Sequence, residues 1–389
     1  MSHRPLRAAC IAALLLVAGP VPHAGAEPGL PAAEPVGVLL TRLQGLYQKA
    51  EEATEAYNAT DVALKNSLAE ERLRTVELGK ARSALDSEKA IAGHLAREQY
   101  QATRGGISPY ARMVLAGNPQ AALDQRRLTA REGARRAGVL DRLARGEKAA
   151  DDRAARARKA LDTQQTLAAQ QKVHKDEVTV QLKEVERMLS SLTGEQLAQL
   201  GAKEAENTAA AQRELVDSGR LPTRTATPTA AGGQALAYAA AQIGKPYVWG
   251  AEGPGAFDCS GLTSQAWAHA GRTIPRTSQE QWAQLPKVPL DQLRPGDLVV
   301  YFPKATHVGL YVGGGKVIQA PRPGAKVKVS PIAANPLLGA VRPDSDGTPL
   351  AEFTPPRLPG NEDGGAAAAG DDTGYSAEEA PTDDDTSAR

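Results

Sequence analysis

The sequence has few residues that could cross-link the chain or build a conventional aromatic core. Only two cysteines, Cys10 and Cys259, occur in 389 residues, which excludes a fold held together by several disulfides. Aromatic residues make up 4% of the chain, and most of them fall between residues 234 and 343. We therefore expect one region with an aromatic-rich core and a different architecture elsewhere.

Long hydrophobic runs are also lacking. The most apolar stretch, residues 8–19, spans about 12 residues, whereas a membrane-spanning helix needs roughly 20. Arginines at positions 4 and 7 precede this stretch and Ala24-Gly25-Ala26 follows it, which is typical of an export signal, residues 1–26, cleaved after Ala26. We therefore expect a secreted protein, extracellular or associated with the cell wall, whose mature chain keeps Cys259 as its one thiol.

The near-neutral net charge of +1 hides an uneven distribution of charge. Residues 234–343 are basic, whereas residues 344–389 are acidic and have few large apolar groups that could pack. The acidic segment is predicted to be a disordered tail. Residues 217–233, rich in Pro, Thr, Ala and Gly, are predicted to form a flexible linker.

A coiled-coil pattern dominates the first half of the chain. From residue 36 to residue 103, apolar side chains recur at steps of three and four, and the pattern stops at the sequence Gly105-Gly106-Ile107-Ser108-Pro109. A second helix is expected from Asn118-Pro119 to an interruption at Thr193-Gly194. The two lengths, about 67 and about 73 residues, favour an antiparallel hairpin within residues 27–216 over a parallel dimeric coil. Its tip, at about residues 104–118, is either a small capping core or a docking site for a partner.

One cysteine stands where a reactive thiol is expected. Asp258 is a good N-cap for a helix that starts at Cys259, and the first turn of a helix favours a thiolate. A thiolate can act as a nucleophile in catalysis. The alternative is an inert, buried cysteine.

A thiolate nucleophile requires a base, and His307 is the one histidine placed to serve. The other five lie in the signal segment, in the predicted coiled coil, or ten residues along the helix that carries Cys259. His307 opens a predicted strand that turns back through Gly313-Gly314-Gly315. If all three glycines form the loop, Gln319 lies on the same face as His307 and can orient its ring, whereas a two-residue turn would put it on the opposite face. Asp297 is the alternative orienting residue.

Five motifs in order over about 110 residues resemble the NlpC/P60 family of cell-wall cysteine peptidases. They are Gly244-Lys245-Pro246-Tyr247-Val248-Trp249-Gly250, Asp258-Cys259-Ser260-Gly261-Leu262, Pro275-Arg276-Thr277-Ser278-Gln279-Glu280-Gln281, Leu293-Arg294-Pro295-Gly296-Asp297-Leu298, and His307-Val308-Gly309-Leu310-Tyr311-Val312 continued by Ala320-Pro321-Arg322. The resemblance implies an α+β fold in which a papain-like catalytic domain, residues 234–343, follows the long coiled-coil hairpin.

The resemblance also implies roles for individual residues. Cys259 would be the nucleophile, His307 the base and Gln319 the third residue, a position where many members have histidine. Tyr247 would help to hold the oxyanion, and four residues would line the substrate groove, namely Asp258, Ser260, Arg276 and Ser278. No metal or cofactor is implied, and no nucleic-acid partner is expected.

The implied reaction is hydrolysis of an amide in the stem peptide of peptidoglycan, typically between γ-D-glutamate and the diamino acid. The thiolate would attack the carbonyl, and water would release the resulting thioester. We expect the hairpin to regulate the enzyme, either by covering the groove or by docking its tip on a membrane-embedded division complex. The alternatives are an inert wall-binding scaffold and an amidase or acyltransferase of the same fold.

Overall fold

The computed structural model describes residues 34–105, 111, 114–115, 119–223 and 226–358. The predicted export signal, most of the predicted hairpin tip and residues 359–389 lie outside the described residues. Within the described residues, no helix combines the length and the apolar character needed to cross a membrane.

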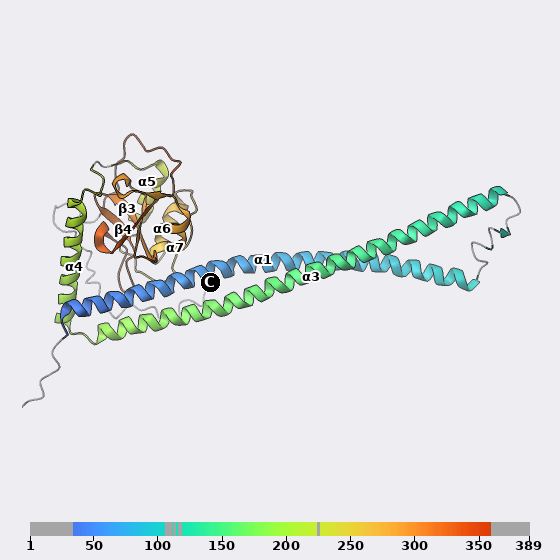
Figure 1. Cartoon of the computed structure of the whole chain (residues 1–389), viewed down its shortest axis with the longest axis horizontal. Helices are drawn as coiled ribbons and strands as arrows, with labels where there is room; N and C mark the ends of the chain where they lie inside the picture. Colours follow the sequence, from blue (N-terminus) through green and yellow to red (C-terminus); the bar gives the residue numbers. More distant parts are fainter. Residues whose placement is uncertain (1–33, 106–110, 112–113, 116–118, 224–225, 359–389) are drawn as a thin grey trace, which may run out of the picture.

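Two long helices form a hairpin that extends far from the rest of the molecule (Figure 1). Helix α1 spans Val36–Gly105 and helix α3 spans Pro119–Ser190, close to the limits predicted from the apolar pattern. They lie side by side and run in opposite directions. At the base of the hairpin, large side chains fill the space between the helices, including Leu43 and Leu189. Further along, small buried residues such as Ala150 and Ala160 let the two helices approach closely.

The second helix ends where the sequence predicted an interruption. Thr193 caps the next helix, α4 (Gly194–Asp217), through a capping box: its side chain accepts a hydrogen bond from the backbone N–H of Gln196, and the Gln196 side chain accepts one from the backbone N–H of Thr193. Because the chain turns here, α4 runs away from the hairpin and along the C-terminal domain (Figure 1).

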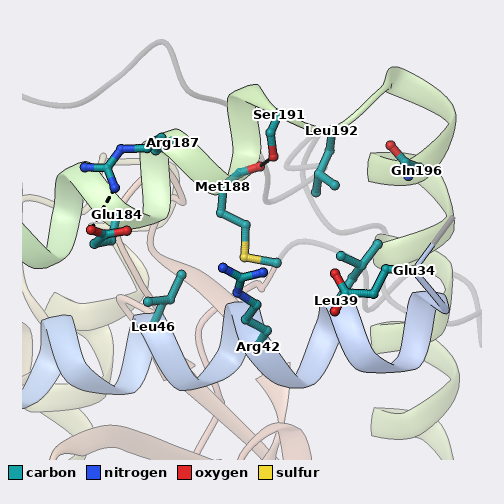
Figure 2. A pocket seen from close by; sticks show the side chains of 10 residues that line it. All are labelled: Glu34, Leu39, Arg42, Leu46, Glu184, Arg187, Met188, Ser191, Leu192 and Gln196. Carbon is teal, nitrogen blue, oxygen red and sulfur yellow. Dashed lines mark hydrogen bonds and ion pairs between the residues drawn. The ribbon is translucent and has the colours of Figure 1, made fainter. Parts of the chain in front are cut away.

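A cavity of about 460 Å³ lies at this turn, between α1, α3 and the start of α4 (Figure 2). Its lining mixes apolar residues with charged ones, as illustrated by Met188, which points toward Arg42 across the cavity. None of the site residues expected from the sequence lines it.

The C-terminal domain is built on one antiparallel sheet with helices on its faces. The helices are α5 (Ala230–Ala240), α6 (Cys259–His269) and α7 (Ser278–Gln284), with short 3-10 helices η1 (Leu290–Gln292) and η2 (Ile332–Ala334). The six strands lie in the order β1-β6-β2-β3-β4-β5. Their bounds are β1 Lys287–Val288, β2 Leu298–Tyr301, β3 His307–Gly313, β4 Lys316–Gln319, β5 Lys328–Pro331 and β6 Leu337–Val341.

The sheet is buried on both faces. Leu298 and Val300 of β2 pack in a core with α5 and α6, whereas Val299 and Tyr301, which alternate with them, pack with Leu215 of α4. Helix α4 is therefore part of the packing of this domain. Its Gln212 side chain also donates a hydrogen bond to the Gly315 carbonyl and accepts one from the Ala333 N–H.

The packed domain extends beyond both boundaries expected from composition. Helix α5 already begins at Ala230, within the predicted linker. After residue 343, the Asp344 carboxylate pairs with the buried Arg294 guanidinium at 2.8 Å, and the Leu350 N–H bonds to the Pro228 carbonyl at 2.8 Å. Leu358 is 8% exposed and joins the core. The prediction that the tail begins at residue 344 is thus wrong for residues 344–358, because a buried arginine needs a counter-charge that this segment supplies.

Candidate active site

The predicted nucleophile occupies the first turn of a helix, as expected. Asp258 adopts an extended backbone, and its side chain accepts a hydrogen bond from the N–H of Gly261 at 2.6 Å. This N-cap starts α6 at Cys259. The Cys259 side chain is buried, and helix α6 holds it against the core of the domain.

The hairpin between β3 and β4 has the register that brings Gln319 to His307. Leu310 pairs with Ile318 and Tyr311 with Val317, and a bulge near the turn shifts the next pair to Gly313 and Lys316. His307 and Gln319 therefore share one face of the sheet, and His307 Nε2 lies 2.7 Å from Gln319 Oε1. Because an amide oxygen can only accept, this contact fixes a ring that donates from Nε2.

Asp297, the alternative orienting residue, lies elsewhere. Its carboxylate accepts hydrogen bonds from Nε and Nη2 of Arg342, both at 2.8 Å, and from the backbone N–H of Arg294. These bonds hold the turn before β2, so Asp297 has a structural role and does not orient His307.

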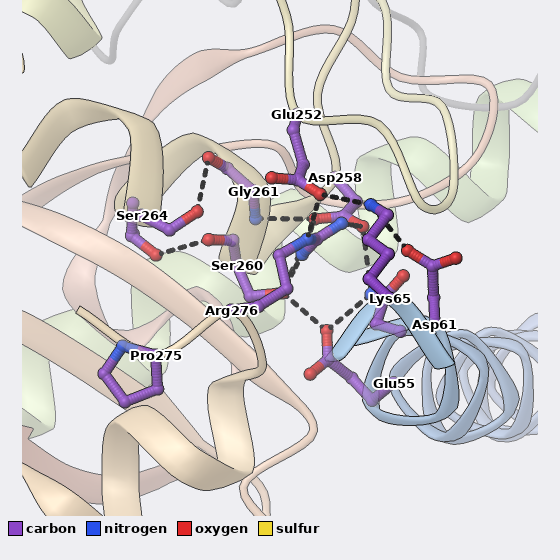
Figure 3. A network of polar contacts seen from close by, with 12 residues as sticks. Glu55, Asp61, Lys65, Glu252, Asp258, Ser260, Gly261, Ser264, Pro275 and Arg276 are labelled. Carbon is purple, nitrogen blue, oxygen red and sulfur yellow. Dashed lines mark hydrogen bonds and ion pairs between the residues drawn. The ribbon is translucent and has the colours of Figure 1, made fainter. Parts of the chain in front are cut away.

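Three of the four residues predicted to line the groove, Asp258, Ser260 and Arg276, form a connected network, shown in Figure 3. Arg276 donates to both Asp258 oxygens, at 2.7 and 3.0 Å, and to Ser260 Oγ at 2.9 Å. Ser278 donates through its hydroxyl to the Ala305 carbonyl at 2.7 Å. The network ties the loop before α7 to the N-terminus of the helix that carries Cys259.

Tyr247 is buried in the same site. Burial, followed by the negative charges of Cys259 as a thiolate and of Asp258, raises its pKa well above the ordinary value. Its hydroxyl therefore stays protonated and can donate a hydrogen bond, which suits the predicted role beside an oxyanion.

Helix α1 inserts side chains into this site, which the sequence did not reveal. Glu55 accepts a hydrogen bond from Ser260 Oγ at 2.7 Å and another from the Ser278 backbone N–H at 2.7 Å. Its Oε1 atom also lies 3.9 Å from Cys259 Sγ. One turn earlier, Glu51 Oε1 lies 3.2 Å from His307 Nδ1.

Neighbouring residues of α1 hold the helix against the domain. Asn58 donates to Asp258 Oδ2 at 3.1 Å, and Tyr57 packs edge-on against Trp249 with ring centroids 5.1 Å apart. Glu52 pairs with Lys304 at 3.0 Å at the exposed margin of the contact. The site is therefore covered by a fitted polar surface, and the sequence around residues 51–58 carries no signal that distinguishes it from an ordinary polar helix face.

In this arrangement the thiol is not activated. Burial raises the pKa of Cys259 well above its usual value, and the carboxylates of Glu55, Asp258 and Glu51 add to the rise. The sequence predicted the opposite, a thiolate favoured by the helix N-terminus. The prediction fails here because three nearby negative charges and the loss of water outweigh the helix dipole.

Comparisons with known proteins identify a family for the domain that holds this site. Residues 244–339 match the model of the NlpC/P60 family, and the chain belongs to that family through this domain. Over 100 residues, 25% of this chain, it is 54% identical to a protein of Corynebacterium glutamicum named as a probable endopeptidase, and it spans 48% of that protein's length.

Two further proteins show different extents of likeness. A Mycobacterium bovis protein, also named as a probable endopeptidase, is 28% identical over 358 residues, which cover 80% of this chain and 90% of that protein. A solved structure of RipD from Mycobacterium tuberculosis, described as a non-catalytic NlpC/p60 domain protein adapted to peptidoglycan binding, is 35% identical. It covers 29% of this chain and 96% of its own, with a TM-score of 0.27.

Proposed function

We propose that this protein is an exported peptidoglycan hydrolase that cleaves an amide bond of the stem peptide by a cysteine–histidine mechanism. The observation that supports it most directly is the placement of Cys259 in the first turn of α6, in one site with a His307 ring held by Gln319. The family to which the domain belongs and the names of its relatives agree with this proposal.

The chemistry follows from these groups once α1 has left the site. Cys259 Sγ attacks the amide carbonyl carbon, and the oxyanion is stabilised by the free N–H groups of the α6 N-terminus and by the Tyr247 hydroxyl. His307 Nδ1, which took the thiol proton, gives it to the leaving amine, and the C–N bond breaks to give a thioester. His307 then takes a proton from water as the water attacks, the C–S bond breaks to release the acid, and the proton returns to Cys259 Sγ.

The way in which Glu55 is bound supports a substrate that carries a carboxylate beside the scissile bond. Ser260 Oγ and the Ser278 N–H both donate to the Glu55 carboxylate, next to Cys259. The bond after γ-D-glutamate has such a neighbour, because the glutamate is linked through its side chain and keeps its α-carboxylate. We therefore propose the bond between γ-D-glutamate and the diamino acid as the one cleaved.

Helix α1 supports regulation by the hairpin, since a stem peptide and Glu55 cannot occupy the same donors. The test is digestion of purified sacculi by the full chain and by a variant lacking residues 34–190, which retains α4, with Cys259→Ala in both as the control. We expect cleavage at the γ-D-glutamyl bond, seen by mass spectrometry of the released muropeptides, mainly in the shortened enzyme. Equal release with and without Cys259 would rule out the peptidase.

A second candidate is an inert, wall-binding scaffold, as described for the RipD structure. The presence of both Cys259 and His307 favours the enzyme. If the shortened variant binds sacculi and releases no fragments, the scaffold is correct. Products other than a cleaved stem peptide would indicate an amidase or acyltransferase instead.

The far end of the hairpin supports a partner in the membrane. Val114 is 80% exposed and Leu115 70% exposed at the described part of the tip, which we propose docks on a membrane-embedded division complex. A photo-crosslinking residue at position 115 should capture an integral membrane protein in cells, and one at the exposed Leu161 should not. Export itself is tested by sequencing the secreted chain, which we expect to begin at Glu27.

A further inference from the structure

Two glutamates of α1 are buried where the helix covers the catalytic groups. Glu51 is 6% exposed and Glu55 is 1% exposed, and because they are four residues apart they point from the same side of the helix. Charged side chains are almost never buried to this degree without specific partners. The partners in this case are the catalytic groups and their immediate neighbours.

Glu51 acts on the base. Gln319 accepts a hydrogen bond from Nε2 of His307, and Glu51 Oε1 lies 3.2 Å from Nδ1, the other ring nitrogen. An imidazole can accept a proton only at a nitrogen with a free lone pair. With a neutral amide on one side and a carboxylate on the other, the pKa of the ring is raised, which favours the charged form that cannot take the proton of Cys259.

Glu55 acts on the nucleophile. Its carboxylate fills the two donors offered by Ser260 and Ser278 and lies 3.9 Å from Cys259 Sγ. A second negative charge, on Asp258, is fixed nearby, although Arg276 partly compensates for it. A thiolate would therefore form in a buried site beside the Asp258 carboxylate, and beside a second carboxylate once Glu55 ionises.

We propose that Glu51 and Glu55 form a carboxylate lock that switches off both catalytic groups chemically, Glu51 by holding the His307 base and Glu55 by occupying the anion site next to Cys259. The lock rests on the proposed function, since it describes how that enzyme is held inactive. It differs from simple coverage because individual carboxyl groups, rather than the bulk of the helix, determine whether the site is active.

We call the protein closed when α1 lies in the site, as it does in this structure. The same contacts make the stability of the closed state depend on pH. Burial and the Asp258 charge raise the pKa of Glu55 from 4.5 to about 7. Burial alone would lower the pKa of His307, but Glu51 outweighs burial and the pKa is raised. The pKa of Cys259 is raised by burial and by the three carboxylates. Three further sets of titratable groups surround these residues: Tyr247 from the loop before α6, Arg276 from the loop before α7, and the ion pair between Glu252 and Lys65 at the edge of the site.

The sign of the pH effect follows from these shifts. A group whose pKa is higher in the closed state binds more protons there, so closure is favoured at low pH and weakens as pH rises. For Glu55, a shift from 4.5 to about 7 weakens closure about tenfold between pH 6 and pH 8. Raising the pH from 6 to 8 should therefore weaken the lock, even without a partner.

The test measures alkylation of Cys259 by iodoacetamide in the full chain, with Cys10→Ser in every variant so that Cys259 is the only thiol. Glu55→Gln mimics the protonated form of Glu55, so the closed state of this variant no longer depends on the Glu55 proton. The reactivity of Cys259 in the open state, with α1 out of the site, is the same in this variant as in the parent. The alkylation rate of the parent protein relative to Glu55→Gln should therefore rise about tenfold from pH 6 to pH 8.

Two other variants should open the site. Glu55→Ala empties the anion site, and Glu51→Gln removes the negative charge that lies beside His307. Both variants should therefore be alkylated at Cys259 at least tenfold faster than the parent at pH 6. The matched control is Glu52→Gln, since Glu52 is on the same helix and contacts the domain through Lys304 but reaches neither catalytic group. Its rate should stay within twofold of the parent.

The outcomes separate the lock from the proposed function. If Glu51→Gln and Glu55→Ala react at the parent rate, or if the parent and Glu55→Gln change in parallel with pH, the lock is overturned, whether or not sacculi are digested. If both opening variants react fast and yet neither digests sacculi, the lock stands and the peptidase fails.

Discussion

Gln319 Oε1 lies 2.7 Å from His307 Nε2, so the third member of the proposed catalytic group is a neutral amide. An amide fixes the orientation and the protonated nitrogen of the imidazole, but it does not stabilise an imidazolium as a carboxylate would. The active site therefore relies on geometry more than on charge at this position.

Replacement of Gln319 should accordingly affect the chemical step. In the Glu55→Ala background, Gln319→Ala should lower kcat about 100-fold with little change in KM, because general acid–base catalysis by a positioned side chain contributes roughly 10²- to 10⁴-fold. Steady-state hydrolysis of a muropeptide measures both constants. Gln319→His, which restores a ring partner, should recover most of the rate. A change confined to KM would contradict an orienting role.

Arg276 should contribute to stability as well as to the groove. Arg276→Ala leaves Asp258 buried without its ion-pair partner, and removal of one partner of a buried pair costs about 3–5 kcal/mol. We expect a clear fall in the melting temperature of the domain by calorimetry. Arg272→Ala is the control, because its pair with Asp346 is exposed and should contribute little to stability. Equal effects of the two substitutions would argue against the buried pair.

The segment after residue 343 should be needed for a stable domain. A chain that ends at residue 343 loses Asp344, which leaves Arg294 without its carboxylate partner, and it also loses the packing of Leu358. We expect it to unfold at a lower urea concentration than a chain that ends at residue 358. Coincident unfolding curves would show that residues 344–358 contribute nothing.

The hairpin should be stabilised at its base. Leu43 is fully buried between α1 and the neighbouring helices, so Leu43→Ala should cost about 2–5 kcal/mol. Leu73 is 54% exposed on the same helix, and Leu73→Ala should change the free energy of unfolding by less than about 0.5 kcal/mol. Hydrogen exchange of the α1 amides would locate the loss of protection near the base.

Local patterns in the sequence predicted much of this architecture. The apolar steps and the Thr193-Gly194 break gave the limits of α1 and α3 to within two residues, because helix periodicity and capping are local properties. The N-cap at Asp258 likewise placed Cys259 correctly in the fold. The three-glycine loop was wrong, because Gly313 pairs with Lys316 across a two-residue turn, and it is the bulge beside this turn that puts His307 and Gln319 on one face.

Contacts between distant segments could not be predicted in the same way. Glu51 and Glu55 have the spacing of any solvated helix face, and only their approach to residues more than 200 positions away makes them part of the site. Asp344 belongs to an acidic stretch by composition, and its role depends on an arginine buried 50 positions earlier. The pKa of Cys259 was predicted in the wrong direction for the same reason.

The length of α1 has a mechanical consequence. Fifty residues separate Glu55 from the distal end of the helix, which corresponds to a lever arm of about 75 Å. A small rotation of the paired helices about the turn at Thr193 would become a large sweep at the far end, and a modest pull there would apply a large torque to the few polar contacts at residues 51–58. Under the proposed regulation, the hairpin would convert a force exerted at its far end into the exposure of Cys259.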